Sequence, residues 1–265
     1  MPDDNDPLIL RLLAHGALDA AERAGLDALL DDRVEAAAGE VLEAAGTERR
    51  HAWIVLRGWC LRSRLSEDGG RQVVNFLLPG ETCGLFAIVF RRAEHEFSAL
   101  TDAVLARVPT PRLSSLFASS PRMAWLLTWL AAHDERLLEE QIVRLGLKES
   151  PHRLAHLLCE LQARATVAGL DNGEALQLPL TQAVLGETLG LSRVHVNRVF
   201  RELAEAGVVD TGEDGGIAIT DLARLRRIAR FDDHHLVPGA DGNRRPSPVA
   251  TPPAARPGTQ KPPAA

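Results

Sequence analysis

The sequence contains no tyrosine, few aromatic residues and no long hydrophobic segment. Aromatic side chains make up 4% of the 265 residues, whereas 45% are hydrophobic and 25% are charged, a balance typical of a globular protein. No window approaches the ~18 consecutive apolar residues of a membrane-spanning helix. The N-terminal segment, residues 1–6, is acidic, unlike the basic start of an export signal. We therefore expect a cytoplasmic protein that contacts no membrane.

Cysteine is scarce as well. The three cysteines, Cys60, Cys83 and Cys159, are widely spaced in the sequence, so no close pair offers the ligands of a zinc or iron–sulfur site. We expect three buried thiols in a reducing compartment, with no metal and no cofactor. Residues 232–235, Asp-Asp-His-His, are adjacent polar groups near the end of the chain that we expect to be solvated.

The chain also lacks an excess of positive charge. Its formal net charge is −6 at pH 7, which excludes a protein coated in basic residues. Any contact with nucleic acid must therefore come from a local basic patch. The length suggests two domains, each large enough to bury a core without disulfide or metal support.

The N-terminal half combines helix with short strands. The first forty residues favour helix, because Asp19 and Glu22 form a capping box and apolar residues follow at helical spacing. From about Gly39 the pattern changes to short apolar runs separated by turn signals such as Arg57-Gly58. The runs that we assign to strands are 53–56, 59–61, 73–78 and 104–108. Several short strands at this spacing predict a barrel or sandwich.

A long helix is predicted over residues 121–147. Trp125, Trp129, Ala132 and Arg136 form one row, flanked by leucines, and at ~1.5 Å per residue the helix spans roughly 38 Å. A helix of this length can form a dimer interface. The alternative interpretation is that it is an ordinary core helix of one subunit. Ser150-Pro151 then begins a new helix with a cap and a proline at its first position, which marks a domain boundary. The Pro-, Ala- and Gly-rich segment after about Pro238 is predicted to be disordered.

Residues 181–207 have the spacing of a helix-turn-helix. Thr181 caps a short helix that Gly190 ends in a left-handed conformation. Ser192 then caps a second helix whose inner face is Val196, Val199 and Leu203. Its other face carries basic and polar groups, and the three arginines between residues 192 and 201 have no acid among them, giving a local charge of +3. This is the basic patch that the overall charge requires.

The second helix of such a motif enters the major groove, where arginine reads guanine and asparagine reads adenine. Arg198 and Asn197 are therefore the predicted base readers. Val194 is placed to contact a thymine methyl, and Arg193 and His195 to reach bases or phosphates. The remaining candidate DNA-binding residues are Thr181 and Gln182 at the first helix, which suit a backbone phosphate, together with Ser192 and Arg201.

The following residues distinguish this motif from an ordinary helical hairpin with a solvated basic face. Val208-Val209 and residues 217–219 are short apolar runs around a glycine-rich turn, as in the wing of a winged helix. Thr220 and Asp221 then begin a final helix that closes the small domain.

This order of parts resembles the Crp/Fnr family of bacterial transcription regulators. The likeness covers roughly residues 20–232 and is most specific at 178–198, with 77–84 and 99–102 similar to sheet-domain stretches. It implies an α+β fold with an N-terminal jelly-roll-like β-barrel, a dimerisation helix and a C-terminal winged helix-turn-helix. The corresponding domains are a cyclic-nucleotide-binding-like sensor domain (1–120), the dimerisation helix (121–148), the DNA-binding domain (149–235) and a disordered tail (236–265).

The resemblance also implies a function. Members regulate transcription as homodimers on palindromic operators, with two recognition helices about one DNA turn, ~34 Å, apart. The implied partners are double-stranded DNA, a second copy of the chain and RNA polymerase.

The sequence departs from the family pattern at the effector site. Members that bind cyclic nucleotide carry Gly-Glu for the ribose and Arg-Ser for the phosphate, but here Leu85 follows Gly84. Glu94 and Glu96 lie near the phosphate position, where each opposes an anion by roughly 1–4 kcal/mol. We therefore do not expect cyclic AMP binding. Three dispersed cysteines also cannot supply the four ligands of the oxygen-sensing branch. Histidines such as His95 leave a haem-type sensor open, and the effector is not identified.

The recognition helix departs from the pattern too. Many relatives have glutamate at the position of Val194, and Ser-Arg or Gly-Arg where this chain has Asn197-Arg198. Because a carboxylate that accepts from cytosine is lost, a different operator is expected, at ~1–3 kcal/mol for each altered base pair.

Two other classes of function stand beside the regulator. One is a small-molecule sensor module whose helix-turn-helix makes protein contacts only. The other is an enzyme that uses the sheet domain for regulation. The sequence shows no nucleophile elbow, phosphate-binding glycine loop, paired-histidine metal motif or suitable catalytic acid pair, so we predict that the protein is not an enzyme.

Overall fold

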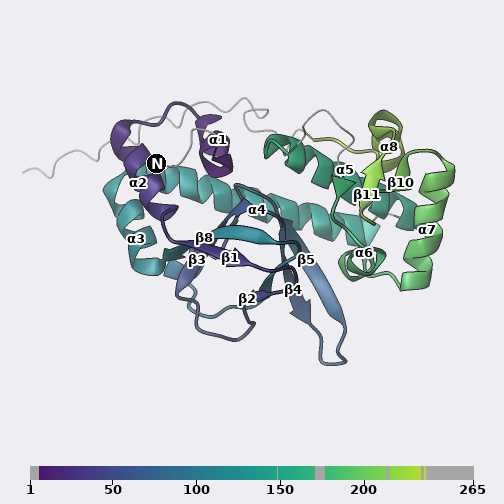
Figure 1. Ribbon diagram of the computed structural model, residues 1–265, viewed down its shortest axis with the longest axis horizontal. Coiled ribbons are helices and arrows are strands. Elements are labelled where there is room, and N and C mark those ends of the chain that lie inside the picture. Colours follow the sequence, from purple (N-terminus) through teal and green to yellow (C-terminus); the bar gives the residue numbers. More distant parts are fainter. Residues whose placement is uncertain (1–5, 148, 171–176, 213–214, 234–235, 237–265) are drawn as a thin grey trace, which may run out of the picture.

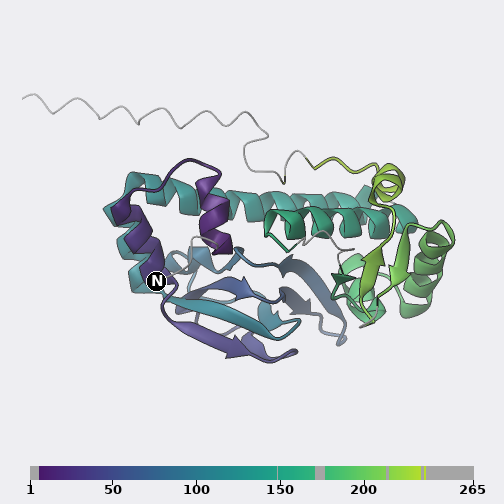
Figure 2. The same cartoon turned by 45° about the horizontal axis from the view of Figure 1, so that its top comes forward.

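A long helix, α4 (Pro121–Leu147), runs along a barrel of strands on one side and ends at a helical domain (Figures 1 and 2). The computed structural model describes residues 6–147, 149–170, 177–212, 215–233 and 236. Within these ranges, every helix is too short or too polar to cross a bilayer. The predicted helix over 121–147 is confirmed.

Two short helices precede the barrel. In α1 (Pro7–Leu13) the Asp6 carboxylate accepts a hydrogen bond from the Leu8 backbone N–H. In α2 (Ala20–Leu29) Asp19 and Glu22 form the predicted capping box, each side chain accepting from the other residue's backbone N–H. The helices bury leucines against β3, β8 and α4, so they cover one side of the barrel.

The barrel consists of two four-stranded antiparallel sheets, with strand orders β1-β8-β3-β6 and β2-β7-β4-β5. The strands are β1 (Arg33–Ala36), β2 (Val41–Glu43), β3 (His51–Arg57), β4 (Cys60–Leu65), β5 (Arg71–Leu77), β6 (Thr82–Cys83), β7 (Glu96–Ala99) and β8 (Ala103–Pro109). Trp53, Val55, Leu77, Phe97 and Leu105 fill the space between the sheets. The four predicted strands are confirmed. The expectation of helix throughout the first forty residues was wrong for β1, because this short segment takes its structure from pairing with β8.

Gly58 makes the turn between β3 and β4. Its φ is +79°, a conformation that side chains other than glycine's rarely adopt, and a Cβ there would lie 2.2 Å from the Asp102 backbone oxygen. Glycine is thus required at this turn both for its backbone conformation and because the Asp102 backbone lies so close to it.

A short 3-10 helix, η1 (Leu85–Ile88), lies between β6 and β7. After β8, the last strand of the barrel, the chain continues through α3 (Thr110–Ser119) into α4. The buried apolar residues of α4 are Met123, Leu126, Leu127, Leu130 and Leu137. The row predicted to pack, Trp125, Trp129, Ala132 and Arg136, is therefore only partly buried. Trp125 and Trp129 are half-buried against His15, whereas Ala132 and Arg136 are exposed.

The C-terminal domain is a winged helix. Its elements are α5 (Ser150–Val167), β9 (Gln177–Leu178), α6 (Gln182–Leu189), α7 (Arg193–Glu205), β10 (Val209–Thr211), β11 (Ile217–Ile219) and α8 (Leu222–Ala229). The predicted cap of α5 was wrong: Glu149 is the N-cap residue, Ser150 is already helical, and no side chain caps this end. The sequence pattern did not indicate β9, which is only two residues long and forms by pairing with β11.

A single hydrophobic core joins the winged helix to the barrel. Trp59, Leu61, Val73, Phe76 and Leu78 from the barrel pack in the same cluster as the buried residues of α5 to α8. Leu236, the first residue of the predicted tail, is 2% exposed and packs with Leu137 and Ala163; the rest of that segment lies outside the described residues. The two regions of the chain are therefore tightly packed on one another.

Candidate DNA-binding surface

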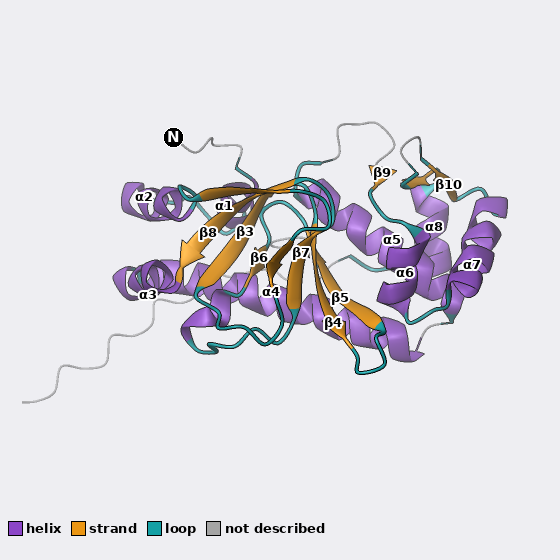
Figure 3. Ribbon diagram, turned by 60° about the horizontal axis from the view of Figure 1, so that its bottom comes forward, coloured by secondary structure: helices purple, strands orange, loops and turns teal. Residues whose placement is uncertain are grey.

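The helix-turn-helix consists of α6 and α7, which pack against each other at the end of the molecule farthest from α2 and α3 (Figure 3). Thr181 Oγ1 accepts from the Val184 N–H at 3.3 Å, and Ser192 Oγ accepts from the His195 N–H at 3.3 Å. Gly190 ends α6 with φ +64°. Both predicted caps and the predicted left-handed glycine are thus confirmed.

The inner face of α7 fixes its orientation. Val196 and Val199 are fully buried and Leu203 is 3% exposed. Gly186 in α6 allows the turn to approach closely, because a Cβ there would lie 2.8 Å from the Leu191 backbone oxygen. The sequence reasoning did not single out Gly186, since only the packed arrangement shows how close the turn comes.

The outer face of α7 is open to solvent. Val194 is 82% exposed, which for a valine at the start of a helix leaves its methyl groups available for an apolar contact. The structure brings all nine predicted residues together at the start of α6 and along α7. They are exposed (Thr181, Ser192, Arg193, Val194, Asn197, Arg198, Arg201) or half-buried (Gln182, His195).

Hydrogen bonds arrange these polar side chains into two groups. In the first, Asn197 Nδ2 donates to Gln182 Oε1 at 3.1 Å and Arg201 Nη2 donates to Asn197 Oδ1 at 3.3 Å. In the second, Arg198 lies 3.0 Å from His195 Nε2 and donates to Glu202 Oε1 at 2.7 Å. The sequence reasoning missed Glu202, although its spacing of four residues from Arg198 is the signal that predicts such a pair on a helix.

The wing follows α7 as predicted. β10 and β11 pair in antiparallel register, with Thr211 opposite Ile217, and β9 adds a third strand on the other side of β11. The Gly212 N–H donates to the Gly216 carbonyl at 2.9 Å. The turn residues 213 and 214 lie outside the described residues.

The region around Gly84 in the barrel is a second candidate ligand site. Arg49 Nε donates to Glu43 Oε1 at 2.8 Å, and both side chains are largely buried. Arg49 also lies against Gly84, where an added Cβ would be 3.2 Å from its Cδ. Burial lowers the pKa of His95, as do Arg62, Arg64 and Arg49, which favours its neutral form.

The three cysteines are buried free thiols, as expected. Burial raises the pKa of Cys60 and of Cys159 to about 12, and that of Cys83 to about 11. Burial therefore favours the protonated thiol form of all three. Across the described ranges, no three histidine, cysteine or acidic side chains are gathered as metal ligands. His234 and His235 lie outside those ranges.

Comparison with known families matches both parts of the chain. A model described as the Crp-like helix-turn-helix domain matches residues 152–228, and one described as the cyclic nucleotide-binding domain matches residues 33–120. The chain belongs to the Crp/Fnr family. The sequence-based resemblance and the α+β fold class are therefore confirmed.

Individual relatives in the Crp/Fnr family are transcription regulators. The anaerobic regulatory protein of Aggregatibacter actinomycetemcomitans is 25% identical over 77% of this chain and 79% of its own length. The nitrogen fixation regulation protein FixK of Bradyrhizobium diazoefficiens is 27% identical over 80% of this chain and 88% of its own.

Solved structures agree on the Crp/Fnr fold. FixK2 from Bradyrhizobium japonicum superposes with a TM-score of 0.61 at 20% identity, covering 76% of this chain and 98% of that one. A CRP-family regulator from Thermus thermophilus gives the same TM-score and identity over 75% and 97% of the two chains. The family is one of DNA-binding transcription regulators and not of enzymes, and the protein-contact alternative is not favoured.

Proposed function

We propose that this Crp/Fnr protein is a homodimeric regulator that reads a palindromic operator through α7. The observation that carries the proposal is the orientation of α7, which buries Val196 and Val199 while its arginines and Asn197 face solvent. A helix so placed in a complete winged helix-turn-helix fits the major groove.

Each predicted residue has a proposed role. Arg198 reads guanine and Asn197 reads adenine, and Val194 contacts a thymine methyl. Arg193, His195 and Arg201 reach bases or phosphates along α7, and Ser192 caps the helix that presents them. Thr181 and Gln182, at the start of α6, hold a backbone phosphate, and Gln182 also orients Asn197 by accepting from its amide.

Selection of bound sequences from a random duplex pool tests this proposal. Arg198→Ala should lose the preference for one base pair in each half-site, worth ~1–3 kcal/mol. Arg224→Ala is the matched control, because Arg224 is also an exposed arginine on a helix but lies in α8, outside the helix-turn-helix. An Arg198→Ala protein that selects the wild-type sequence would refute the assignment.

The proposed dimer uses the exposed side of α4. Six of its exposed residues follow the alternating four- and three-residue spacing of a coiled-coil seam: Thr128, Ala132, Glu135, Glu139, Ile142 and Gly146. Ile142 is 70% exposed and Val143 41% exposed, and a second copy of α4 would cover both. Ile142→Asp should therefore shift the protein to monomer in analytical ultracentrifugation, whereas persistence of the dimer would place the interface elsewhere.

We also propose that the barrel does not bind cyclic AMP. The buried Arg49–Glu43 pair lies beside Gly84, and the position after Gly84 is the buried Leu85 where a nucleotide-binding member has its ribose carboxylate. Calorimetry with cyclic AMP and cyclic GMP tests this, and tight binding of either would contradict it. An absorbance spectrum of the purified protein tests for haem or an iron–sulfur cluster.

The remaining proposed partner is RNA polymerase, and the proposed location is the cytoplasm. Transcription in a purified system, from a promoter carrying the selected operator, tests whether the polymerase responds to the bound regulator.

A further inference from the structure

The guanidinium of Arg198, the proposed guanine reader, is held at both of its terminal nitrogens. Arg198 Nη1 donates to Glu202 Oε1 at 2.7 Å, and Nη2 lies 3.0 Å from His195 Nε2. Because arginine has only N–H donors, Nε2 accepts in this contact and the imidazole carries its proton on Nδ1. Val194, four residues before Arg198, has a side chain that cannot accept a hydrogen bond. The two contacts therefore come from one residue on each side of Arg198 along α7.

The spacing of these residues on α7 places them in one row. His195, Arg198 and Glu202 are separated by three and four residues, so they follow one another on the same face of the helix. Helical side chains point back toward the N-terminus, which directs the Glu202 carboxylate toward Arg198 and the Arg198 guanidinium toward His195. That direction leads to the first turn of α7, and the first turn of a recognition helix enters the major groove. The contacts thus keep the guanidinium where a base would be read.

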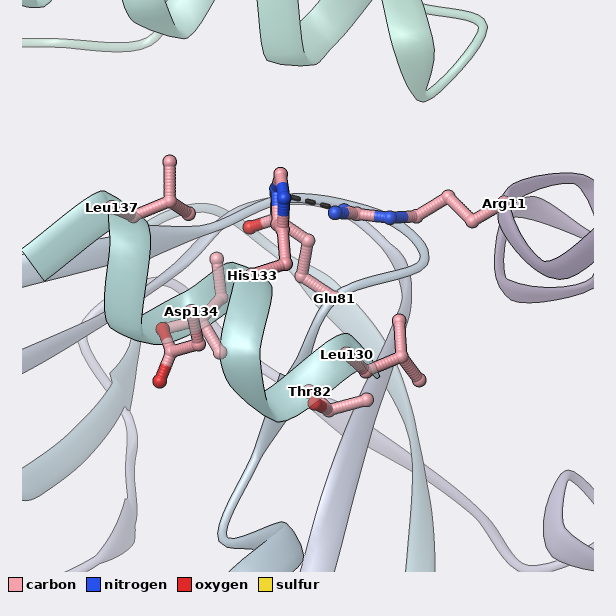
Figure 4. A pocket seen from close by; sticks show the side chains of 8 residues that line it. Arg11, Glu81, Thr82, Leu130, His133, Asp134 and Leu137 are labelled. Carbon is pink, nitrogen blue, oxygen red and sulfur yellow. Dashed lines mark hydrogen bonds and ion pairs between the residues drawn. The ribbon is translucent and has the colours of Figure 1, made fainter. Parts of the chain in front are cut away.

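Burial does not explain this pairing. Where charged side chains are buried, pairing is required: Glu81, in the turn between β5 and β6, accepts from Arg11 of α1 at 2.9 Å and from Arg164 of α5 at 2.6 Å. Figure 4 shows Arg11 reaching from α1 toward Glu81. Arg198 and Glu202, by contrast, are 60% and 42% exposed, and an exposed pair adds little to stability. Loss of this pair should leave the fold intact, so its consequence should appear in what α7 binds.

Charge alone makes the position of Glu202 unfavourable for DNA binding. Residues 193–201 contain no acid, and Glu202 is the first carboxylate after this basic segment. Because its Oε1 lies 2.7 Å from Arg198 Nη1, a phosphate drawn to Arg198 would also meet a negative charge. The pair therefore weakens the general attraction of Arg198 for the DNA backbone, a contact that carries no sequence information.

Enough donors of Arg198 stay available for a base. A guanidinium has five N–H groups, and Glu202 and His195 each accept from a different nitrogen. One N–H on each Nη and the one on Nε remain, whereas a bidentate contact with guanine O6 and N7 uses two. A guanidinium fixed in this way loses less side-chain freedom when DNA binds than a free one does. It also reaches fewer alternative acceptors, so its preference for guanine should be sharper.

We infer that Glu202 is a positioning residue that sets specificity: together with His195, it fixes the Arg198 guanidinium for one guanine in each half-site and does not itself contact a base. The inference rests on the proposed function of α7. It gives Glu202 a role through its hydrogen bond to Arg198, which is separable from the effect of its charge on DNA binding.

The second proposed reader provides an internal reference. Asn197 is held by different residues, because its amide donates to Gln182 and accepts from Arg201. Loss of Glu202 should therefore affect the base pair that Arg198 reads and leave the preference for adenine at the Asn197 position unchanged.

Two substitutions of Glu202 separate its hydrogen bond from its charge. Glu202→Gln keeps an oxygen that can accept from Arg198, whereas Glu202→Ala removes it, and both remove the negative charge. Affinities are measured for the selected operator, for operators changed at the base pair that Arg198→Ala identifies, and for random-sequence duplex. Glu202→Ala should lose preference at that base pair by roughly 2- to 10-fold, the factor for ordering one long side chain on binding. Glu202→Gln should retain most of the preference.

Two further measurements exclude an effect of charge or of folding. Both variants of Glu202 should bind random-sequence DNA more tightly and with a steeper dependence on salt. Glu205→Ala is the matched control, since Glu205 is an exposed acid three residues further along α7, and it should leave the base preferences unchanged. Urea denaturation of Glu202→Ala should give a midpoint close to that of the wild type.

The outcomes separate this inference from the proposed function. If the wild type selects no DNA sequence, the proposed function fails. If it selects one but Glu202→Ala keeps the full preference, or Glu202→Gln loses as much as Glu202→Ala, the positioning role is overturned while the function stands. Loss of preference at a different base pair would show that Glu202 reads a base itself and would also overturn the inference. A loss confined to the base pair that Arg198 reads, and absent when Arg198→Ala is already present, supports it.

Discussion

Acid should lower the free energy of unfolding of this protein by protonating Glu81, and Glu81→Gln should remove this contribution. Burial by itself raises the pKa of Glu81, but Arg164 and Arg11 outweigh burial and lower the pKa from 4.5 to about 2. A difference of this size between folded and unfolded protein corresponds to about 3 kcal/mol. Since the side chain is 8% exposed, solvent screening reduces this figure little.

The sign follows from the lowered pKa. The ionised carboxylate stabilises the folded protein above pH 4.5, and this contribution is lost as the pH falls toward 2. At pH 3 roughly 2 kcal/mol should already be gone, because the unfolded chain binds a proton that the folded chain does not. Glutamine at this position does not titrate, so the variant should be less stable at pH 6 but should lose less stability on acidification.

Urea denaturation at pH 6 and pH 3, followed by circular dichroism, measures the difference. The fall in the free energy of unfolding between the two pH values should be about 2 kcal/mol smaller in Glu81→Gln than in the wild type. Glu205→Gln, on the exposed side of α7, is the control for removing a carboxylate as such. Equal falls in the wild type and Glu81→Gln would refute the argument that the two arginines hold Glu81 ionised.

Three more substitutions probe the turn, the cap and the seam. Gly58→Ala should destabilise the protein by at least ~2 kcal/mol in urea denaturation, because φ is +79° and the Cβ would meet the Asp102 carbonyl; an unchanged midpoint would mean that the turn relaxes freely. Ser192→Ala should cost ~1 kcal/mol by removing the cap of α7, whereas exposed Ser114→Ala on α3 should cost less. Glu139→Leu should tighten the dimer by about tenfold or more, since two copies would otherwise bring like charges together on the seam; sedimentation showing weaker association would place Glu139 outside the interface.

Several features could be predicted from the sequence because short-range chemistry determines them. The capping box at Asp19, the caps at Thr181 and Ser192 and the left-handed Gly190 each depend on residues within a few positions along the chain. The apolar periodicity of α7 separates its buried face from its exposed one, and for that reason the candidate DNA-reading residues follow from the amino-acid pattern alone.

Apart from the cap of α5, the segments that were mispredicted or missed depend on distant partners. β1 and β9 are too short to carry a strand pattern, and they form only because β8 and β11 present free edges to them. On α4 the periodic pattern indicated a helix with an apolar side, but packing of α1, α2 and the barrel decided that Leu126 and Leu130 are buried and Ala132 is not.

The amino-acid pattern specifies a winged helix-turn-helix with a basic face, a strand-rich domain before it and a long helix between them, because hydrophobic period and capping are local properties. Packing in three dimensions was needed to bring Arg11, Glu81 and Arg164 together, from positions 70 and 83 residues apart in the chain. No local pattern encodes such a meeting, since each of these residues alone is indistinguishable from an ordinary surface charge. Burial in a shared core is what makes them partners, and that depends on how the barrel, α1 and α5 pack.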